Sequence, residues 1–240
     1  MANACVCGEY FQVSDTGELC LRPGRQGLRD VIVYDTVGSH QFQKSNYPWL
    51  ARVRVQVQGG GGGSAGALAA AGELVARPGG GGGGWSMSVI SALLLGTVET
   101  VVVGAGGVAG TTNGTGGAGG NSSFGGLVVA QGGPGSPAAM ASGTGPEATG
   151  GIAGANPGTG LVALGGGASN GAIRLSQFQA LAGAGGESRL GHGGLARHTP
   201  GPGTAPQGYG SGAGGSLSAA NTAQPGGAGA RGVVIVELYG

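Results

Sequence analysis

The stretch Gly104–Ala109 is the part of the sequence that could hold a nucleotide cofactor. It follows the apolar run VETVVV and matches the G-x-G-x-x-G/A pattern, in which glycines end a strand and a helix N-terminus meets the pyrophosphate. The residues that follow, GTTNGTGGAGGNSS, are too rich in glycine for that helix. No carboxylate lies between Glu99 and Glu147, although the ribose needs one about 20 residues on. Because the only lysine, Lys44, follows no glycine loop, a P-loop is excluded and we predict no cofactor.

The three cysteines, Cys5, Cys7 and Cys20, are the residues whose spacing could bind a metal. A structural zinc site usually has four ligands, and the nearest further candidate is His40. We predict buried or reduced thiols in a small N-terminal cap, and therefore no metal. A mononuclear metal site at these cysteines stays open as the weaker alternative.

Acid–base catalysis would depend on very few groups. The only histidines are His40, His192 and His198. Paired-carboxylate hydrolysis needs two acids within about 5–10 Å, and only Glu147 and Glu187 lie between Val103 and Gly232. A Ser-His-Asp arrangement is spatial, so the order of residues does not exclude it. We predict no catalytic residues and no enzyme, with polysaccharide hydrolysis as the less favoured alternative.

Composition narrows the class of protein further. Glycine supplies 62 of 240 residues and charged residues only 9%, but the chain is 40% hydrophobic, which is enough apolar surface to fold. Collagen is excluded because glycine does not recur at every third position. A net charge of +1 with scattered basic residues argues against nucleic acid as a partner.

The chain shows no pattern of a membrane segment. Its longest apolar run, about Val89–Val103, is interrupted by Gly96 and Glu99, so we predict no membrane insertion. The first residues, MANACVCGEYFQV, lack a basic start followed by an apolar core, so we expect no signal peptide and a chain made in the cytoplasm.

Residues 1–58 have an ordinary composition, and strand rules apply there. Asp30–Tyr34 and His40–Gln43 predict a β-hairpin. Arg52–Gln58 alternates without error, which predicts a strand with three valines on its buried face. The only segment that could form a helix is Ser64–Arg77, where alanine and leucine are dense but glycines weaken the prediction.

Alternating or apolar runs also follow the glycine tracts. Trp85–Ile90 and Thr97–Val103 predict two further strands, and Trp85, Met87 and Val89 would share a face. The last residues, Gly232–Tyr239, form an apolar strand that would promote aggregation at a free edge. We therefore expect this strand to insert between earlier strands or between subunits.

The glycine tracts themselves predict a packed structure. Glycine chains in the polyproline II conformation have three residues per turn and rise about 3.1 Å per residue. Without Cβ atoms they can lie close enough to hydrogen-bond laterally. An interior helix of such a bundle must be glycine on every side, as in Gly79–Gly84, whereas a peripheral one can carry alanine, serine, threonine or asparagine. The alternative is that the tracts are loose linkers.

Five motifs in order carry a family resemblance: RVRVQVQGGGGGSAG, GGGGGGWSMS, ETVVVGAGGVAG, NSSFGGLVVAQGG and GARGVVIVELYG. Together they resemble the glycine-rich domain of bacteriophage tail proteins, most closely the glycine-rich minor tail proteins of phages infecting actinobacteria. The resemblance covers residues 28–240 and leaves residues 1–27 as an N-terminal cap or attachment segment. It is also similar to a glycine-rich region of certain animal receptor tyrosine kinases, in which a jelly-roll β-sandwich holds a polyglycine bundle.

The resemblance implies an all-β fold, namely a jelly-roll-like β-sandwich with an inserted bundle of polyglycine II helices. It further implies a homotrimer in the virion tail, assembled in the host cytoplasm, that contacts other phage tail proteins and a bacterial cell-surface glycan or protein. The expected function is a structural tail-tip or tail-fibre protein that presents loops for host recognition. A purely architectural cap or decoration protein is the alternative.

The loop between residues 186 and 210 concentrates charged and aromatic side chains within an otherwise bland region. Recognition usually resides in loops on a rigid scaffold, so we predict receptor binding there, while solvation of an exposed loop explains the same residues equally well. The candidate residues are Glu187, Ser188, Arg189, His192, Arg197, His198 and Tyr209.

Overall fold

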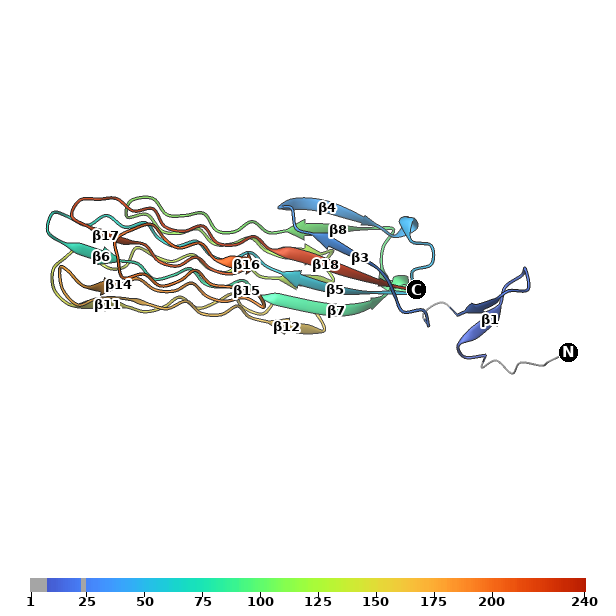
Figure 1. The fold of residues 1–240 in the computed structure, drawn as a ribbon. Coiled ribbons are helices and arrows are strands. Elements are labelled where there is room, and N and C mark those ends of the chain that lie inside the picture. Colours follow the sequence, from blue (N-terminus) through green and yellow to red (C-terminus); the bar gives the residue numbers. More distant parts are fainter. Residues whose placement is uncertain (1–7, 23–24) are drawn as a thin grey trace.

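The computed structural model describes residues 8–22 and 25–240, which form an elongated all-β protein (Figure 1). The described residues contain eighteen strands, two short 3-10 helices, η1 (Lys44–Asn46) and η2 (Ala92–Leu94), and no α-helix. The long strands gather at one end of the molecule, called here the sheet end. Glycine-rich segments, called the glycine body (residues 59–84, 104–121 and 131–232), extend from it to the opposite end, the tip (Figure 1). The all-β prediction is confirmed.

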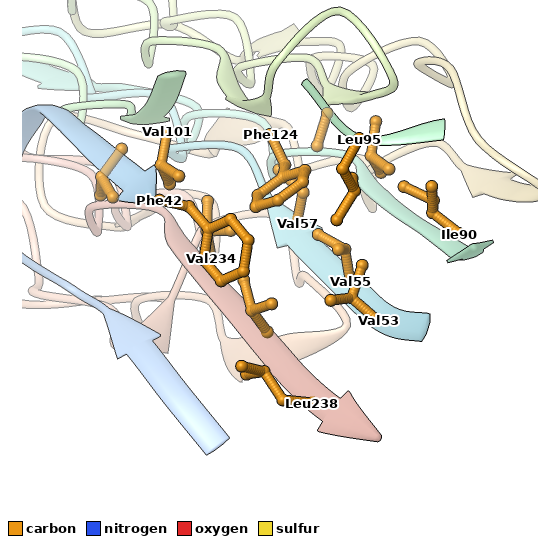
Figure 2. Packing of buried hydrophobic residues seen from close by; sticks show 14 residues of the cluster. Phe42, Val53, Val55, Val57, Ile90, Leu95, Val101, Phe124, Val234 and Leu238 are labelled. Carbon is orange, nitrogen blue, oxygen red and sulfur yellow. The ribbon is translucent and has the colours of Figure 1, made fainter. Parts of the chain in front are cut away.

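Two antiparallel sheets form the sheet end. In order, the five-stranded sheet contains β12 (Val162–Leu164), β7 (Trp85–Ser91), β5 (Arg52–Gln58), β18 (Val233–Tyr239) and β3 (Leu28–Tyr34). The four-stranded sheet contains β10 (Val128–Ala130), β9 (Ser122–Phe124), β8 (Val98–Val103) and β4 (Gly38–Gln43). Side chains from both sheets form one hydrophobic core, in which Phe42 and Phe124 contact each other with ring centroids 5.5 Å apart (Figure 2).

Strand β5 has the face pattern that its alternation predicts. Val53, Val55 and Val57 are fully buried in the core (Figure 2), which confirms the prediction. Gln58, on the opposite face, is also buried because the strand enters the glycine body at this residue. Its amide nitrogen donates hydrogen bonds to the carbonyl oxygens of Gly83 and Gly84, each at 2.9 Å.

The C-terminal strand β18 inserts between β5 and β3, as expected for an apolar strand that cannot remain at an edge. Val236 lies opposite Val55 on one side and Ile32 on the other. The strand that is made last therefore lies near the middle of the five-stranded sheet, and its inward side chains complete the core.

The predicted hairpin between residues 30–34 and 40–43 is wrong. Strand β3 pairs with β18, whereas β4 pairs with β8 in the other sheet. The short link between them crosses from one sheet to the other and includes Gly38, whose φ of 129° is a conformation that side chains disfavour. The pattern of each strand was read correctly, but alternation does not identify the partner.

The helix considered over Ser64–Arg77 is also wrong. Only β6 (Leu74–Ala76) is regular within this segment, and it pairs with β17 (Leu217–Ala219). The rest is bonded to distant segments; for example, the amide of Ser64 donates to Gly227 and that of Ala67 to Gln224. Small side chains permit these close lateral contacts, which replace the local hydrogen bonds of a helix.

Four other pairings complete the strand inventory. At the tip, β13 (Ala172–Arg174) pairs with β11 (Glu147–Thr149) and β14 (Ala180–Leu181). Along the glycine body, β15 (Leu190–His192) pairs with β16 (Gln207–Tyr209). Beyond the sheet end, β1 (Phe11–Val13) and β2 (Leu19–Leu21) form a separate hairpin (Figure 1).

Hydrogen bonds of the run 59–64 repeat every three residues. The amides of 59 and 62 donate to segment 81–84, those of 60 and 63 to 117–120, and those of 61 and 64 to 227–230, at 2.8–3.0 Å. The carbonyls of the same run accept from 107–110, 133–136 and 213. The run is thus surrounded by other segments and fully buried.

The run Gly79–Gly84 has the same pattern of donors. Amides three residues apart share a neighbour, so that the six amides reach 167–170, 210–213 and 131–134 in turn, at 2.7–3.3 Å. All six glycines are buried. The two uninterrupted glycine runs therefore occupy the interior, as predicted, while the mixed tracts include exposed residues such as Thr111, Asn113 and Ala118.

The glycines that match the dinucleotide pattern are part of this packing. The amide of Gly107 donates to Gly61, and no helix follows before the described strand β9. A Cβ atom at Gly106 would overlap the carbonyl of Gly229, and one at Gly107 would overlap that of Gly117. Close packing against neighbouring backbone explains these glycines.

Candidate functional site

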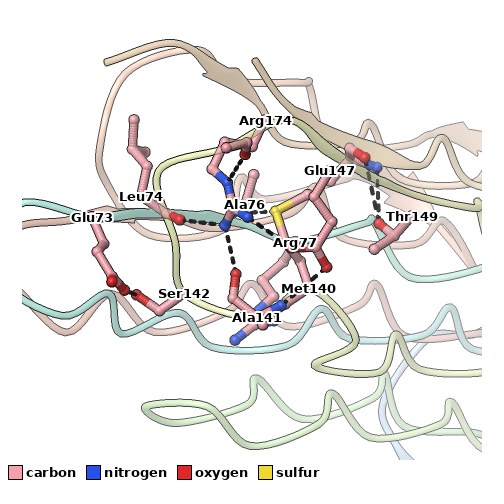
Figure 3. A network of polar contacts seen from close by, with 12 residues as sticks. Glu73, Leu74, Ala76, Arg77, Met140, Ala141, Ser142, Glu147, Thr149 and Arg174 are labelled. Atoms are coloured by element: carbon pink, nitrogen blue, oxygen red, sulfur yellow. Dashed lines mark hydrogen bonds and ion pairs between the residues drawn. The ribbon is translucent and has the colours of Figure 1, made fainter. Parts of the chain in front are cut away.

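Two buried arginines fix the chain at the tip. The guanidinium of Arg174, on β13, donates to the carbonyls of Gly145 at 2.7 Å, Leu74 at 2.8 Å and Ala141 at 2.6 Å, and to the carboxylate of Glu147 at 2.8 Å (Figure 3). The Arg174 side chain is 5% exposed. It therefore ties three separate segments of the glycine body together at its end.

Arg77 follows β6 and is the largest fully buried side chain among the described residues. It donates to the carbonyl of Gly66 at 2.9 Å, the carbonyl of Met140 at 2.6 Å and the side-chain oxygen of Asn113 at 2.7 Å. Burial lowers the pKa of its guanidinium, and the charge of Glu147 opposes part of that shift. Arg77 thus holds the loop around Asn113 against the interior.

Replacing Arg77 with methionine is expected to lower the free energy of unfolding by about 2–4 kcal/mol, because three buried acceptors lose their donor. Denaturant unfolding followed by circular dichroism measures the change. The matched control is Arg189→Met, which alters an exposed arginine of the glycine body and is expected to cost about 0.5 kcal/mol. Equal losses in the two variants would contradict the bracing role of Arg77.

The seven residues predicted for receptor binding separate into two groups. Five lie along the glycine body on or near β15 and β16: Glu187, Ser188, Arg189, His192 and Tyr209. Ser188 donates to the carbonyl of Tyr209 at 2.5 Å, and His192 lies 3.6 Å from Glu187, with both of those side chains largely exposed. The phenol of Tyr209 lies 3.5 Å from Asp35.

Arg197 and His198 lie nearer the tip. The amide of Ala182, next to β14, donates to the carbonyl of Arg197 at 2.8 Å, while the Arg197 side chain donates to the carbonyl of Pro202. His198 lines a hollow that the hairpin β13–β14 forms. The seven residues do not converge on one site, because the connection between β15 and β16 reaches the tip and returns.

The hollow beside His198 was not predicted from the sequence. It has a volume of about 410 Å³, and its lining includes Ile173, Leu175, Phe178 and Gln179. Phe178 is 81% exposed and Leu175 56% exposed, although both are large apolar side chains. The signal available in the sequence was Phe178 itself, the only phenylalanine after Phe124.

The cysteine prediction lies largely outside the described residues, because Cys5 and Cys7 are not among them. Cys20 lies in β2 and has a free thiol. His40 lies in β4, where its ring nitrogen is 2.7 Å from the carbonyl of Thr36. Within residues 8–22 and 25–240, three or more histidine, cysteine, aspartate or glutamate side chains nowhere gather as metal ligands would.

The described part of the chain contains no helix long and apolar enough to cross a membrane. The observed architecture defines an all-β protein in which antiparallel sheets continue into a laterally bonded, glycine-rich body. Residues 36–239 match the family model of the glycine-rich domain, and the chain belongs to this family. A search of curated proteins found no match.

Proposed function

We propose that the protein is a structural component of a bacteriophage tail, at a tail tip or fibre end, whose tip surface binds the host cell. The observation that carries the proposal is an exposed apolar surface around Phe178, held at the end of an elongated body by the buried Arg174. An exposed cluster of large apolar side chains on a braced scaffold is typical of a binding site. The sequence resemblance to phage tail proteins supports the same role. We propose no catalytic role.

The body of this tail component is proposed to be a bundle of polyglycine II helices. The support is the hydrogen-bond repeat of three residues in the runs 59–64 and 79–84, since this helix has three residues per turn. The proposed sandwich at the sheet end is jelly-roll-like. A rigid bundle would hold the tip at a fixed distance from the rest of the virion.

Assembly as a homotrimer and attachment to another tail protein complete the proposal. The outer face of the five-stranded sheet exposes apolar side chains that a neighbouring copy could cover: Val31, Val33, Val89, Val162 and Leu164. The hairpin of β1 and β2 exposes Val13 and Leu19, and such a hairpin is marginally stable alone. This supports residues 1–27 as the attachment segment.

An adsorption experiment tests the proposed function. Purified protein is expected to bind actinobacterial host cells and to compete with phage for adsorption, and antiserum against the protein is expected to block adsorption. A mass measurement of the intact assembly checks that the protein used is the trimer. If the protein fails to bind cells and its antiserum leaves adsorption unchanged, the role is architectural and the proposal of host binding is wrong.

A further inference from the structure

The turn between β13 and β14 holds an aromatic ring outward in a defined position. The amides of Leu175 and Ser176 donate to the carbonyl of Gln179 at 2.8 and 3.2 Å, and the amide of Phe178 donates to the hydroxyl of Ser176 at 3.2 Å. These bonds order the four-residue turn. The ring of Phe178 nevertheless remains 81% exposed.

The apolar side chains next to this turn cannot rotate into the interior. Strand β13 alternates, with Ala172 and Arg174 buried and Ile173 exposed. Because Arg174 makes four hydrogen bonds inside the tip, the strand is fixed with Ile173 and the following Leu175 facing solvent. The exposed apolar face is therefore imposed by the packing below it.

The chemistry of the hollow is uncharged. Its lining contains no lysine, arginine, aspartate or glutamate, and its polar side chains are Gln179 and His198. Nearby charges are already paired, because Glu147 accepts from Arg174 at 2.8 Å. A phosphate or carboxylate ligand would find no counter-charge here. At about 410 Å³ the hollow falls within the range of about 300–1,000 Å³ that is usual for small-ligand sites.

A protein ligand fits the tip less well. Protein interfaces bury about 800 Å² per partner and depend on tryptophan, tyrosine and arginine anchors. The neighbouring tip loops have the sequences LAAAGE (68–73), TTNGT (111–115) and AANTAQ (219–224), which contain none of these anchors. One aromatic ring with two neutral polar groups matches a sugar ring, which has a face of C–H groups and a rim of hydroxyls.

We infer that this hollow binds one neutral sugar unit of a cell-surface polysaccharide. The ring of Phe178 packs against the C–H face of the sugar, while Gln179 and His198 hydrogen-bond its hydroxyls. The inference rests on the proposed host-binding function and names its ligand class.

Phe178→Ala is expected to reduce binding to actinobacterial cells and to immobilised arabinogalactan or mannan at least tenfold. Leu195→Ala, which removes a comparably exposed side chain that does not line the hollow, is the matched control and is expected to bind like the original protein. Phe178→Trp keeps an aromatic surface, retains binding, and changes its fluorescence when the polysaccharide is added. Unchanged thermal midpoints show that the variants fold.

Treatment of the cells separates the two proposals. Periodate, which oxidises sugar diols, is expected to abolish binding, and protease treatment of the cells is expected to leave it intact. Binding that resists periodate, or that Phe178→Ala retains in full, overturns the sugar site but leaves host binding in place. Failure of the original protein to bind any cells overturns host binding itself.

Discussion

Gly80→Ala is expected to destabilise the protein by about 3 kcal/mol or more, a large loss for a single methyl group. A Cβ atom at this position would overlap the carbonyl oxygens of Gly62 and Gly63. Both obstacles are backbone atoms of the other interior run, so no side chain can rotate away. Gly62 itself donates to Gly81 and accepts from Ala213, which prevents it from moving without breaking further bonds.

The matched control for this variant is Gly150→Ala. Gly150 belongs to the same glycine body but would have no atom within 4 Å of an added Cβ and has no positive φ. Alanine there is expected to leave stability unchanged or to raise it by up to about 1 kcal/mol, because it reduces the freedom of the unfolded chain. Denaturant unfolding measures both variants, and hydrogen exchange of the amides in 59–64 and 79–84 reports the local effect. Similar stabilities would mean that the glycine runs are slack linkers.

The sequence predicted those features that depend on one segment alone. The alternation of Arg52–Gln58 indicated its buried valines, and the apolar run at the C-terminus indicated an inserted strand. Uninterrupted glycine indicated an interior position, because only a residue without Cβ can be surrounded by backbone on every side. In each case a local pattern corresponds to one physical requirement.

Features that depend on which segments become neighbours were not predictable. The pairing of β3 with β18 and of β4 with β8 requires knowledge of the whole topology. Likewise, Arg77 and Arg174 have no distinctive neighbours in the sequence, and their acceptors come from segments tens of residues away. The hollow at Phe178 depends on the same network, which explains why the charged loop at 186–210 drew the prediction instead.

Val236→Asn is expected to lower the free energy of unfolding by about 3–5 kcal/mol. Val236 is fully buried in the core, so the variant loses the burial of an apolar side chain, about 1.5–3 kcal/mol, and buries an amide without a partner, about 1–3 kcal/mol. The loss is global because β18 joins β5 to β3.

The adjacent substitution Ile235→Asn provides the control for β18. Ile235 belongs to the same strand but lies on the half-buried outer face, level with Gln56 and Val33. An amide there can reach solvent, and the expected loss is about 1 kcal/mol. Thermal and denaturant unfolding compare the pair directly. Because the two residues are neighbours with the same backbone pairing, a comparable loss at both would show that the inward face of β18 does not carry the core, and the assignment of the C-terminal strand as its closing element would be wrong.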